Sequence, residues 1–303
     1  FTWTPYNFEG FYYDIDDDIG TEKLVAKFSG SKIEDGDLKY ETSPQPVEFE
    51  FEGWGKYDVI GFMADKYFAG YNNATLFTDE FSIINNGELR KVLIDSDEER
   101  TISSGSVLPL ENGYELQIKE VDLDGNKVWL SLTKDGDEVD SKVVTPASGD
   151  LKASTYTYKV RISSEDVPII AAHISNVFRG READLATVDG IFQVSDTPES
   201  VEEGDKHGKM EVDSLSDDGI TLKNDGSISL GRGKDIEIMG NLKFRVADNP
   251  ERNLCPIALR VGKTEPLRLN LTEAIVGKPI MIQVTSGGKA VSGAKVLVGG
   301  KEI

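Results

Sequence analysis

The chain has 303 residues, of which 54 are Asp or Glu and 33 are Lys or Arg, so its formal net charge is −21. This charge repels nucleic acid and anionic membranes and attracts cations, which excludes nucleic-acid-binding proteins as a class. The single cysteine, Cys255, excludes a disulfide framework, and we expect it to be a small buried apolar residue. No apolar stretch reaches the roughly 18 residues of a membrane span, so we expect no membrane insertion by this part of the protein.

Alternating apolar and polar residues predict β-strands along most of the chain. This alternation indicates antiparallel sheets with one buried face and one wet face. Asp-Gly pairs between the strands supply the turn residues that hairpins need. Short helical turns are expected only near residues 65–71 and 164–167. In chain order, the clearest alternating runs are residues 47–51, 116–119, 128–132, 156–162, 236–238 and 243–246.

Several blocks of sequence recur in the same order along the chain. Residues 59–70 align with 169–180, for example, and residues 158–162 resemble 242–246. Each repeat covers about 90–110 residues, which is the usual size of a β-sandwich. The repeat therefore predicts two related domains.

We accordingly expect an all-β fold with two related antiparallel β-sandwich domains in tandem. Residues 1–165 form the first expected domain and residues 166–262 the second. Residues 1–45 lie outside the repeat, so they could add strands to either domain. Residues 263–303 are expected to be a linker or a short C-terminal β-rich extension.

Much of the excess acid lies in short runs between the predicted strands. Acidic side chains in such turns are solvated and stay ionised, so they favour a surface field over a catalytic site. The acidic residues that we expect on exposed turns are Asp97, Glu98, Asp137, Asp217 and Asp218.

Two acidic runs have spacings that invite comparison with calcium loops. Asp14, Asp16 and Asp18 alternate as EF-hand ligands do, and so do Asp122 and Asp124. Neither run has the Gly at position six or the Glu at position twelve that the loop requires. These five residues are therefore candidates only for an irregular Ca²⁺ site, and diffuse attraction of cations is the alternative. We expect no cofactor.

Other residue types give no catalytic constellation. His173 lies in an apolar run and is expected to be a satisfied core residue, whereas His207 lies in a charged loop and is expected to be exposed. Two isolated histidines do not form a usual zinc site. A phosphate-binding loop and a nucleophile elbow are both absent from the sequence. We therefore expect a protein that is not an enzyme.

Tryptophans and sequons offer weaker signals. Trp3, Trp54 and Trp129 could form a sugar-binding platform, but buried anchors are the default for Trp in a sandwich. Asn73 and Asn270 each begin an Asn-X-Thr sequon, so both are glycosylation candidates and hint at an exported protein.

Longer strings of residues carry a family resemblance. They resemble the archaeal, Methanosarcina-type S-layer family, and specifically its duplication domain. The resemblance covers most of residues 1–260. The strings are residues 1–8 (FTWTPYNF), 10–18 (GFYYDIDDD), 57–62 (YDVIGF), 66–71 (KYFAGY), 187–196 (TVDGIFQVSD) and 238–248 (IMGNLKFRVAD).

The resemblance implies a secreted glycoprotein that tiles the cell surface as a two-dimensional lattice. It also implies tandem copies of the domain, with an acidic stalk and a membrane anchor elsewhere in the full chain. No catalytic residues are implied. From it we expect a self-assembling tile whose partners are further copies, with acidic, cation-favouring pores that act as a protective sieve. The alternative is an extracellular β-sandwich adhesin or carbohydrate-binding module.

Overall fold

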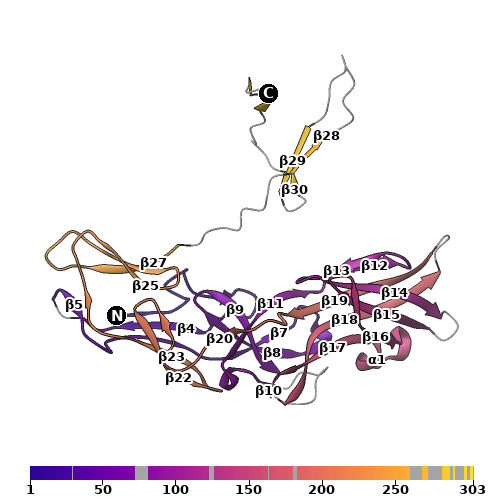
Figure 1. Ribbon diagram of the computed structural model, residues 1–303, viewed down its shortest axis with the longest axis horizontal. Coiled ribbons are helices and arrows are strands. Elements are labelled where there is room, and N and C mark those ends of the chain that lie inside the picture. Colours follow the sequence, from indigo (N-terminus) through magenta and orange to yellow (C-terminus); the bar gives the residue numbers. More distant parts are fainter. Residues whose placement is uncertain are drawn as a thin grey trace. The chain divides into compact units, whose positions relative to one another are not determined.

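The computed structural model (Figure 1) describes residues 1–28, 30–71, 81–122, 126–162, 164–179 and 183–259. Beyond residue 259 it describes the backbone of short strands only. Residues 1–259 and 260–303 form two separate units. In the second unit, β28–β30 form a three-stranded antiparallel sheet and β31–β32 a hairpin. The bounds are β28 (Arg268–Leu271), β29 (Ile282–Ser286), β30 (Lys289–Ala290), β31 (Leu297–Val298) and β32 (Lys301–Glu302).

A six-stranded sheet joins the two ends of the first unit. Its order is β1-β4-β6-β23-β22-β21, and all its neighbours are antiparallel. Tyr40 lies opposite Leu222 where the N-terminal and C-terminal strands meet. The bounds are β1 (Thr2–Trp3), β4 (Glu22–Ala26), β6 (Leu38–Thr42), β21 (Lys206–His207), β22 (Met210–Ser216) and β23 (Gly219–Asn224).

A ten-stranded sheet forms the middle of the unit. Its main order is β17-β18-β19-β11-β9-β8-β7, with β10 on β9, β12 on β19 and β20 on β11. The bounds are β7 (Gln45–Glu48), β8 (Lys56–Phe62), β9 (Asp65–Tyr71), β10 (Phe81–Ser82), β11 (Glu88–Ser96), β12 (Arg100–Ser103), β17 (Thr155–Ile162), β18 (Glu165–Arg179), β19 (Asp184–Val194) and β20 (Glu199–Ser200).

Smaller sheets complete the unit. A four-stranded sheet has the order β13-β14-β15-β16, and Figure 1 shows it beside β17–β19. The bounds are β13 (Val107–Pro109), β14 (Tyr114–Asp122), β15 (Lys127–Lys134) and β16 (Asp137–Val144). The others are β25 (Asp235–Met239), β26 (Leu242–Val246) and β27 (Leu254–Ala258) in one sheet, and the pairs β2 (Tyr13–Asp14) with β3 (Ile19–Gly20) and β5 (Lys32–Ile33) with β24 (Ile228–Ser229).

Helical structure is scarce among the described residues. The helix α1 (Leu151–Ser154) has a single turn, and the Asp150 carboxylate caps it by accepting a bond from the Lys152 amide (3.0 Å). The remaining helical elements are 3-10 turns: η1 (Glu52–Trp54), η2 (Ile84–Asn86) and η3 (Pro146–Ser148).

Two hydrophobic cores fill the first unit. The first core lies between the four-stranded sheet and one face of the ten-stranded sheet, with Leu130 and Phe192 both fully buried in it. The second core lies between the six-stranded sheet and the opposite face of β8, β9 and β11, with Leu222 and Phe244 fully buried in it.

Strands β8 and β9 therefore serve both cores. Val59 and Phe68 point into the first core, whereas Ile60, Tyr67 and Ala69 point into the second. Because successive side chains of a strand point to opposite faces, covering both faces buries a continuous run of residues. This explains why Val59–Phe62 reads as an uninterrupted apolar run and not as an alternating one.

The all-β, antiparallel fold class is confirmed by the described strands. The expected boundary between residues 165 and 166 lies just inside β18, which pairs with β17 in the ten-stranded sheet. Residues 1–45 supply β1, β4 and β6 to the second core, together with strands from residues 206–246.

Three local expectations are wrong. Residues 65–71 form strand β9 and not a helical turn, because both faces of the segment are buried by sheets. The helical turn expected near 164–167 is likewise replaced by strand β18, which begins at Glu165. Cys255 is exposed, because its neighbours on β27, a strand at the edge of its sheet, face the core instead.

Candidate functional site

The N-terminal acidic run, residues 14–18, forms the hairpin turn between β2 and β3 and is held by hydrogen bonds. The Asp14 carboxylate accepts bonds from the Tyr12 hydroxyl (2.9 Å), the Asp16 amide (3.2 Å) and Lys66 Nζ (3.4 Å). Burial alone would raise the pKa of Asp14, but the Tyr12 hydroxyl and Lys66 outweigh it and hold the pKa below its usual value. The Asp18 carboxylate accepts the Tyr13 hydroxyl. The carboxylates of Asp14 and Asp18 are thus both hydrogen-bonded to neighbouring side chains.

The other calcium candidates are only partly described. Asp122 is the last residue of β14 and is exposed, and Asp124 lies outside the described residues. In the described part of the chain, no three His, Cys, Asp or Glu side chains come together as a metal site would require. Of the glycosylation candidates, Asn73 lies outside the described residues and Asn270 lies in strand β28.

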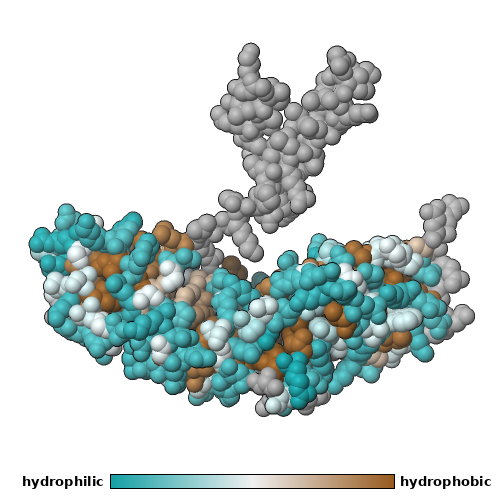
Figure 2. All heavy atoms as spheres, in the orientation of Figure 1, coloured by the Kyte–Doolittle hydropathy of each residue, from teal (hydrophilic) through white to brown (hydrophobic). Residues whose placement is uncertain are grey.

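The five acids expected on turns are all exposed. Glu98 pairs with Arg100 (2.9 Å), and Asp217 accepts a bond from the Asn85 amide (3.0 Å). The turn between β15 and β16 has Asp135 at φ 52° and Gly136 at φ 93°, as an Asp-Gly hairpin turn requires. Figure 2 shows hydrophilic side chains over most of the visible face of residues 1–259.

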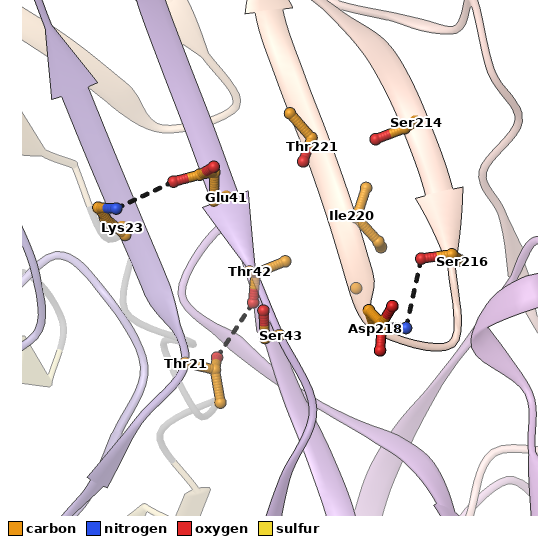
Figure 3. A pocket seen from close by; sticks show the side chains of 11 residues that line it. Thr21, Lys23, Glu41, Thr42, Ser43, Ser214, Ser216, Asp218, Ile220 and Thr221 are labelled. Atoms are coloured by element: carbon orange, nitrogen blue, oxygen red, sulfur yellow. Dashed lines mark hydrogen bonds and ion pairs between the residues drawn. The ribbon is translucent and has the colours of Figure 1, made fainter.

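A polar pocket of about 330 Å³ lies at one end of the six-stranded sheet (Figure 3). Lys23, Glu41, Thr221 and Ser214 lie in one row across β4, β6, β23 and β22. The Lys23 ammonium pairs with Glu41 (3.1 Å) on one side, and the β22–β23 turn with Asp218 closes the other side. The remaining lining residues are Thr21, Thr42, Ser43, Ser216, Gly219 and Ile220.

Several polar groups of this pocket are free to meet a ligand. Among the described residues, the hydroxyls of Ser43, Ser214 and Thr221 and the Asp218 carboxylate have no side-chain partner. By contrast, the Thr42 hydroxyl is already bonded to the Gly61 carbonyl (2.7 Å). Hydroxyls, a carboxylate and an ammonium suit a small polyhydroxylated molecule better than an apolar one.

Sequence reasoning missed a hydrogen-bonded series of Ser154, His173 and Asp189. His173 Nδ1 lies 2.5 Å from Asp189 and Nε2 lies 3.1 Å from the Ser154 hydroxyl. These residue types also form hydrolase triads. Here, however, Ser154 is buried and donates to the carbonyls of its own helix, and the Phe51 ring stacks on the imidazole at 4.5 Å. The series therefore links α1 to β18 and β19, and His173 is a satisfied residue as expected.

The exposure of the tryptophans and of His207 agrees only in part with what the sequence predicts. Trp54 is fully buried, as an anchor should be, but Trp129 is 43% exposed on β15. His207 is only half-exposed, and its ring lies edge-on to Phe62 at 5.5 Å. Within the described residues, no helix is long and apolar enough to cross a membrane.

The described residues thus form an all-β protein with antiparallel sheets around two cores and exposed acidic turns. Residues 1–248 match the family described as S-layer protein. The chain belongs to this family, which is a family of structural proteins and not of enzymes, as the resemblance in the sequence implied.

Three curated relatives are named Major S-layer protein. Those of Methanosarcina barkeri, Methanosarcina mazei and Methanosarcina acetivorans are 33%, 32% and 32% identical to this chain. Each match covers 84% of this chain and 37% of the relative. The chain thus spans little more than a third of the length of these relatives.

Proposed function

We propose that this chain is part of a tile of a self-assembling S-layer, a two-dimensional protein lattice at the cell surface. The observation that carries the proposal is the family match over residues 1–248, supported by relatives named Major S-layer protein. The partners of such a tile are further copies of the same protein. Heterologous contacts between copies that close form rings, and rings within a sheet leave pores.

The two cores suit this role because a tile must keep its shape. Strands β8, β9 and β11 are shared by both cores, so the cores are joined by a hydrogen-bonded sheet and not by a flexible linker. Tyr71 adds a bond from its hydroxyl to the Pro168 carbonyl (2.8 Å) within the first core. We therefore expect the two cores to move together as one body.

We further propose that the exposed acidic turns face the pores. A pore wall that carries Asp97, Glu98, Asp137, Asp217 and Asp218 would concentrate cations and oppose anions within roughly 8 Å at physiological salt. The lattice would then act as a charged molecular sieve. Cations would be held by diffuse attraction, without a dedicated metal site.

The test is imaging of purified full-length protein by negative-stain electron microscopy. A periodic sheet with a repeating tile is the expected result. Isolated particles at every salt and Ca²⁺ concentration would exclude the lattice.

The second candidate function is an adhesin or carbohydrate-binding module, and the polar pocket favours it. Its free hydroxyls and the Asp218 carboxylate provide acceptors and donors for a sugar. A glycan array probed with the 303-residue chain tests this candidate. Binding that is lost in Asp218→Ala but kept in Asp137→Ala, a matched change on another exposed turn, would favour it over the lattice.

A further inference from the structure

Strand β16 forms an edge of the four-stranded sheet. It is the last strand in the order β13-β14-β15-β16, and among the described residues no strand pairs with its other side. Its eight residues are exposed, apart from half-buried Asp140 and buried Val144. An edge of this kind presents unpaired backbone N–H and C=O groups, which are a template for pairing with another chain.

The composition of β16 favours such pairing. Residues 139–144 read VDSKVV, so half of this segment is valine, a β-branched residue that is enriched in strands. The segment has no proline, and its one Asp and one Lys cancel in charge. Short exposed segments with these features associate readily with one another.

The two charges of this segment lie on the side of β16 that faces the first core. Asp140 lies opposite Leu132 of β15, and that leucine is fully buried. Lys142 lies opposite Leu130, which is also fully buried. Because register partners project from the same face of a sheet, both charged side chains start on the core side. Inward-pointing charges on an edge strand are a means by which native sheets avoid pairing with other chains.

Both charged side chains bond to β17, the strand at the end of the ten-stranded sheet. The Asp140 carboxylate accepts a bond from the hydroxyl of Tyr156 (2.6 Å), which belongs to the first core. The Lys142 ammonium donates to the Thr157 hydroxyl (3.1 Å). Burial lowers the pKa of Lys142 although Asp140 acts in the opposite direction, which agrees with an ammonium held against β17. These side chains thus link two strands that do not pair through their backbones.

We propose that Asp140 and Lys142 close the β16 edge to strand addition by a second copy of this chain. A strand added to β16 would displace both side chains from β17 and bury their charges without the present partners, which is costly. The inference rests on the proposed lattice role, because a tile lies among further copies at high density. It implies that the contacts of the lattice do not include a sheet shared across β16.

The experiment is hydrogen–deuterium exchange with mass spectrometry on the 303-residue chain, at low and high protein concentration in about 300 mM NaCl. A peptide that covers β16 reports whether its amides become paired. The test variant is Asp140→Asn with Lys142→Val, which removes both charges and keeps an acceptor for the Tyr156 hydroxyl. The control is Glu138→Gln with Lys119→Val, which also removes one anion and one cation, but from an ion pair (3.0 Å) within the four-stranded sheet.

The test variant is expected to pair along the unguarded edge. Exchange of the β16 peptide should then slow about tenfold or more at high protein concentration, whereas in wild type and control it should not depend on concentration. Circular dichroism first establishes that each variant is folded. If the double variant does not fold, Lys142→Val alone, at an exposed position, provides the same test.

Three results would overturn the inference. A β16 peptide that stays unprotected in the test variant would show that the two charges do not close the edge. Equal protection in the control would show that their position does not matter, and protection in wild type would show that the edge is itself an interface. None of these results decides the tile role, which fails only if full-length wild-type protein forms no periodic sheet.

Discussion

Asp95 is less exposed than Asp97 and Glu98, the acids that follow it in the sequence. It belongs to strand β11, where its carboxylate accepts bonds from the Tyr57 hydroxyl (2.7 Å) and the Glu50 amide (3.1 Å). Burial raises the pKa of Asp95 from 3.8 to about 6, although the Tyr57 hydroxyl and the Glu50 amide act in the opposite direction. A carboxyl with a raised pKa destabilises the folded state once it is ionised.

This predicts an unusual pH dependence for Asp95→Asn. Between about pH 4 and pH 6 the folded protein binds more protons at Asp95 than the unfolded chain does, so the stability contributed by this residue falls as pH rises. Asparagine does not titrate. Relative to wild type, the variant should therefore gain about 2 kcal/mol between pH 4 and pH 7. Urea unfolding at both pH values measures the gain, and a difference that is the same at both would contradict this assignment.

Glu22 is a buried carboxylate that accepts a hydrogen bond from the strained turn between β8 and β9. It is 2% exposed and accepts bonds from the Tyr12 amide (2.5 Å), the Tyr40 hydroxyl (2.7 Å) and the Ala64 amide (3.0 Å). Met63 and Ala64, which connect β8 to β9, have φ values of 51° and 72°. Residues other than Gly rarely adopt such values. The bonds that the Ala64 amide donates to Glu22 and the Met63 amide donates to the Tyr40 hydroxyl oxygen (3.2 Å) offset the strain of the turn.

We expect Glu22→Gln to destabilise the protein by about 2–3 kcal/mol. The new amide group would point hydrogen-bond donors at neighbours that are themselves donors. Chemical denaturation at neutral pH measures the loss. The matched control is Glu9→Gln at an exposed position, which should change stability by less than about 0.5 kcal/mol. Equal effects of the two substitutions would show that Glu22 has no special role.

For single residues, exposure was predictable from the sequence where the residue lies in a turn that directly follows a strand. Asp97, Glu98 and Asp217 follow strands directly and are exposed. The default of a buried Trp was wrong for Trp129, because the alternation of β15 places Val128 and Leu130 on the core face and Trp129 on the opposite face. The hydrogen bonds of His173 with Asp189 and Ser154 could not be predicted from the sequence, because the three residues lie on three separate elements.

Among elements, the strands themselves were mostly predictable, whereas their partners were not. The run at residues 128–132 alternates and forms β15, with Val128, Leu130 and Leu132 in the first core. The pairing of β6 with β23 joins residues 38–42 to residues 219–224, and no local feature of either segment specifies the other. Such distant pairings are set by the packing of whole sheets.

The shared strands predict how the unit unfolds. Because β8, β9 and β11 line both cores, loss of one core exposes apolar surface of the other, so residues 1–259 should unfold in a single transition. Phe192→Leu in the first core and Phe244→Leu in the second should each lower the midpoint of that same transition by several degrees. Differential scanning calorimetry measures this. Two transitions, with each substitution moving only one, would instead favour two independent domains as expected from the repeat.

For the whole molecule, net charge governs association and not fold. At −21, two copies repel each other over distances comparable with the Debye length. We therefore predict that raising NaCl from about 10 mM to 300 mM, or adding millimolar Ca²⁺, promotes association of the purified chain. Static light scattering follows the change. Association that is insensitive to both would mean that the acidic turns do not oppose assembly.

The most direct measurement of the lattice role is cryo-electron tomography of the surface of cells that make this protein, with subtomogram averaging. The account predicts a periodic array into which residues 1–259 fit as a repeating tile, with Asp97, Glu98 and Asp217 facing the openings. A cell surface without periodic order, or an array whose repeating density does not accommodate this unit, would contradict it.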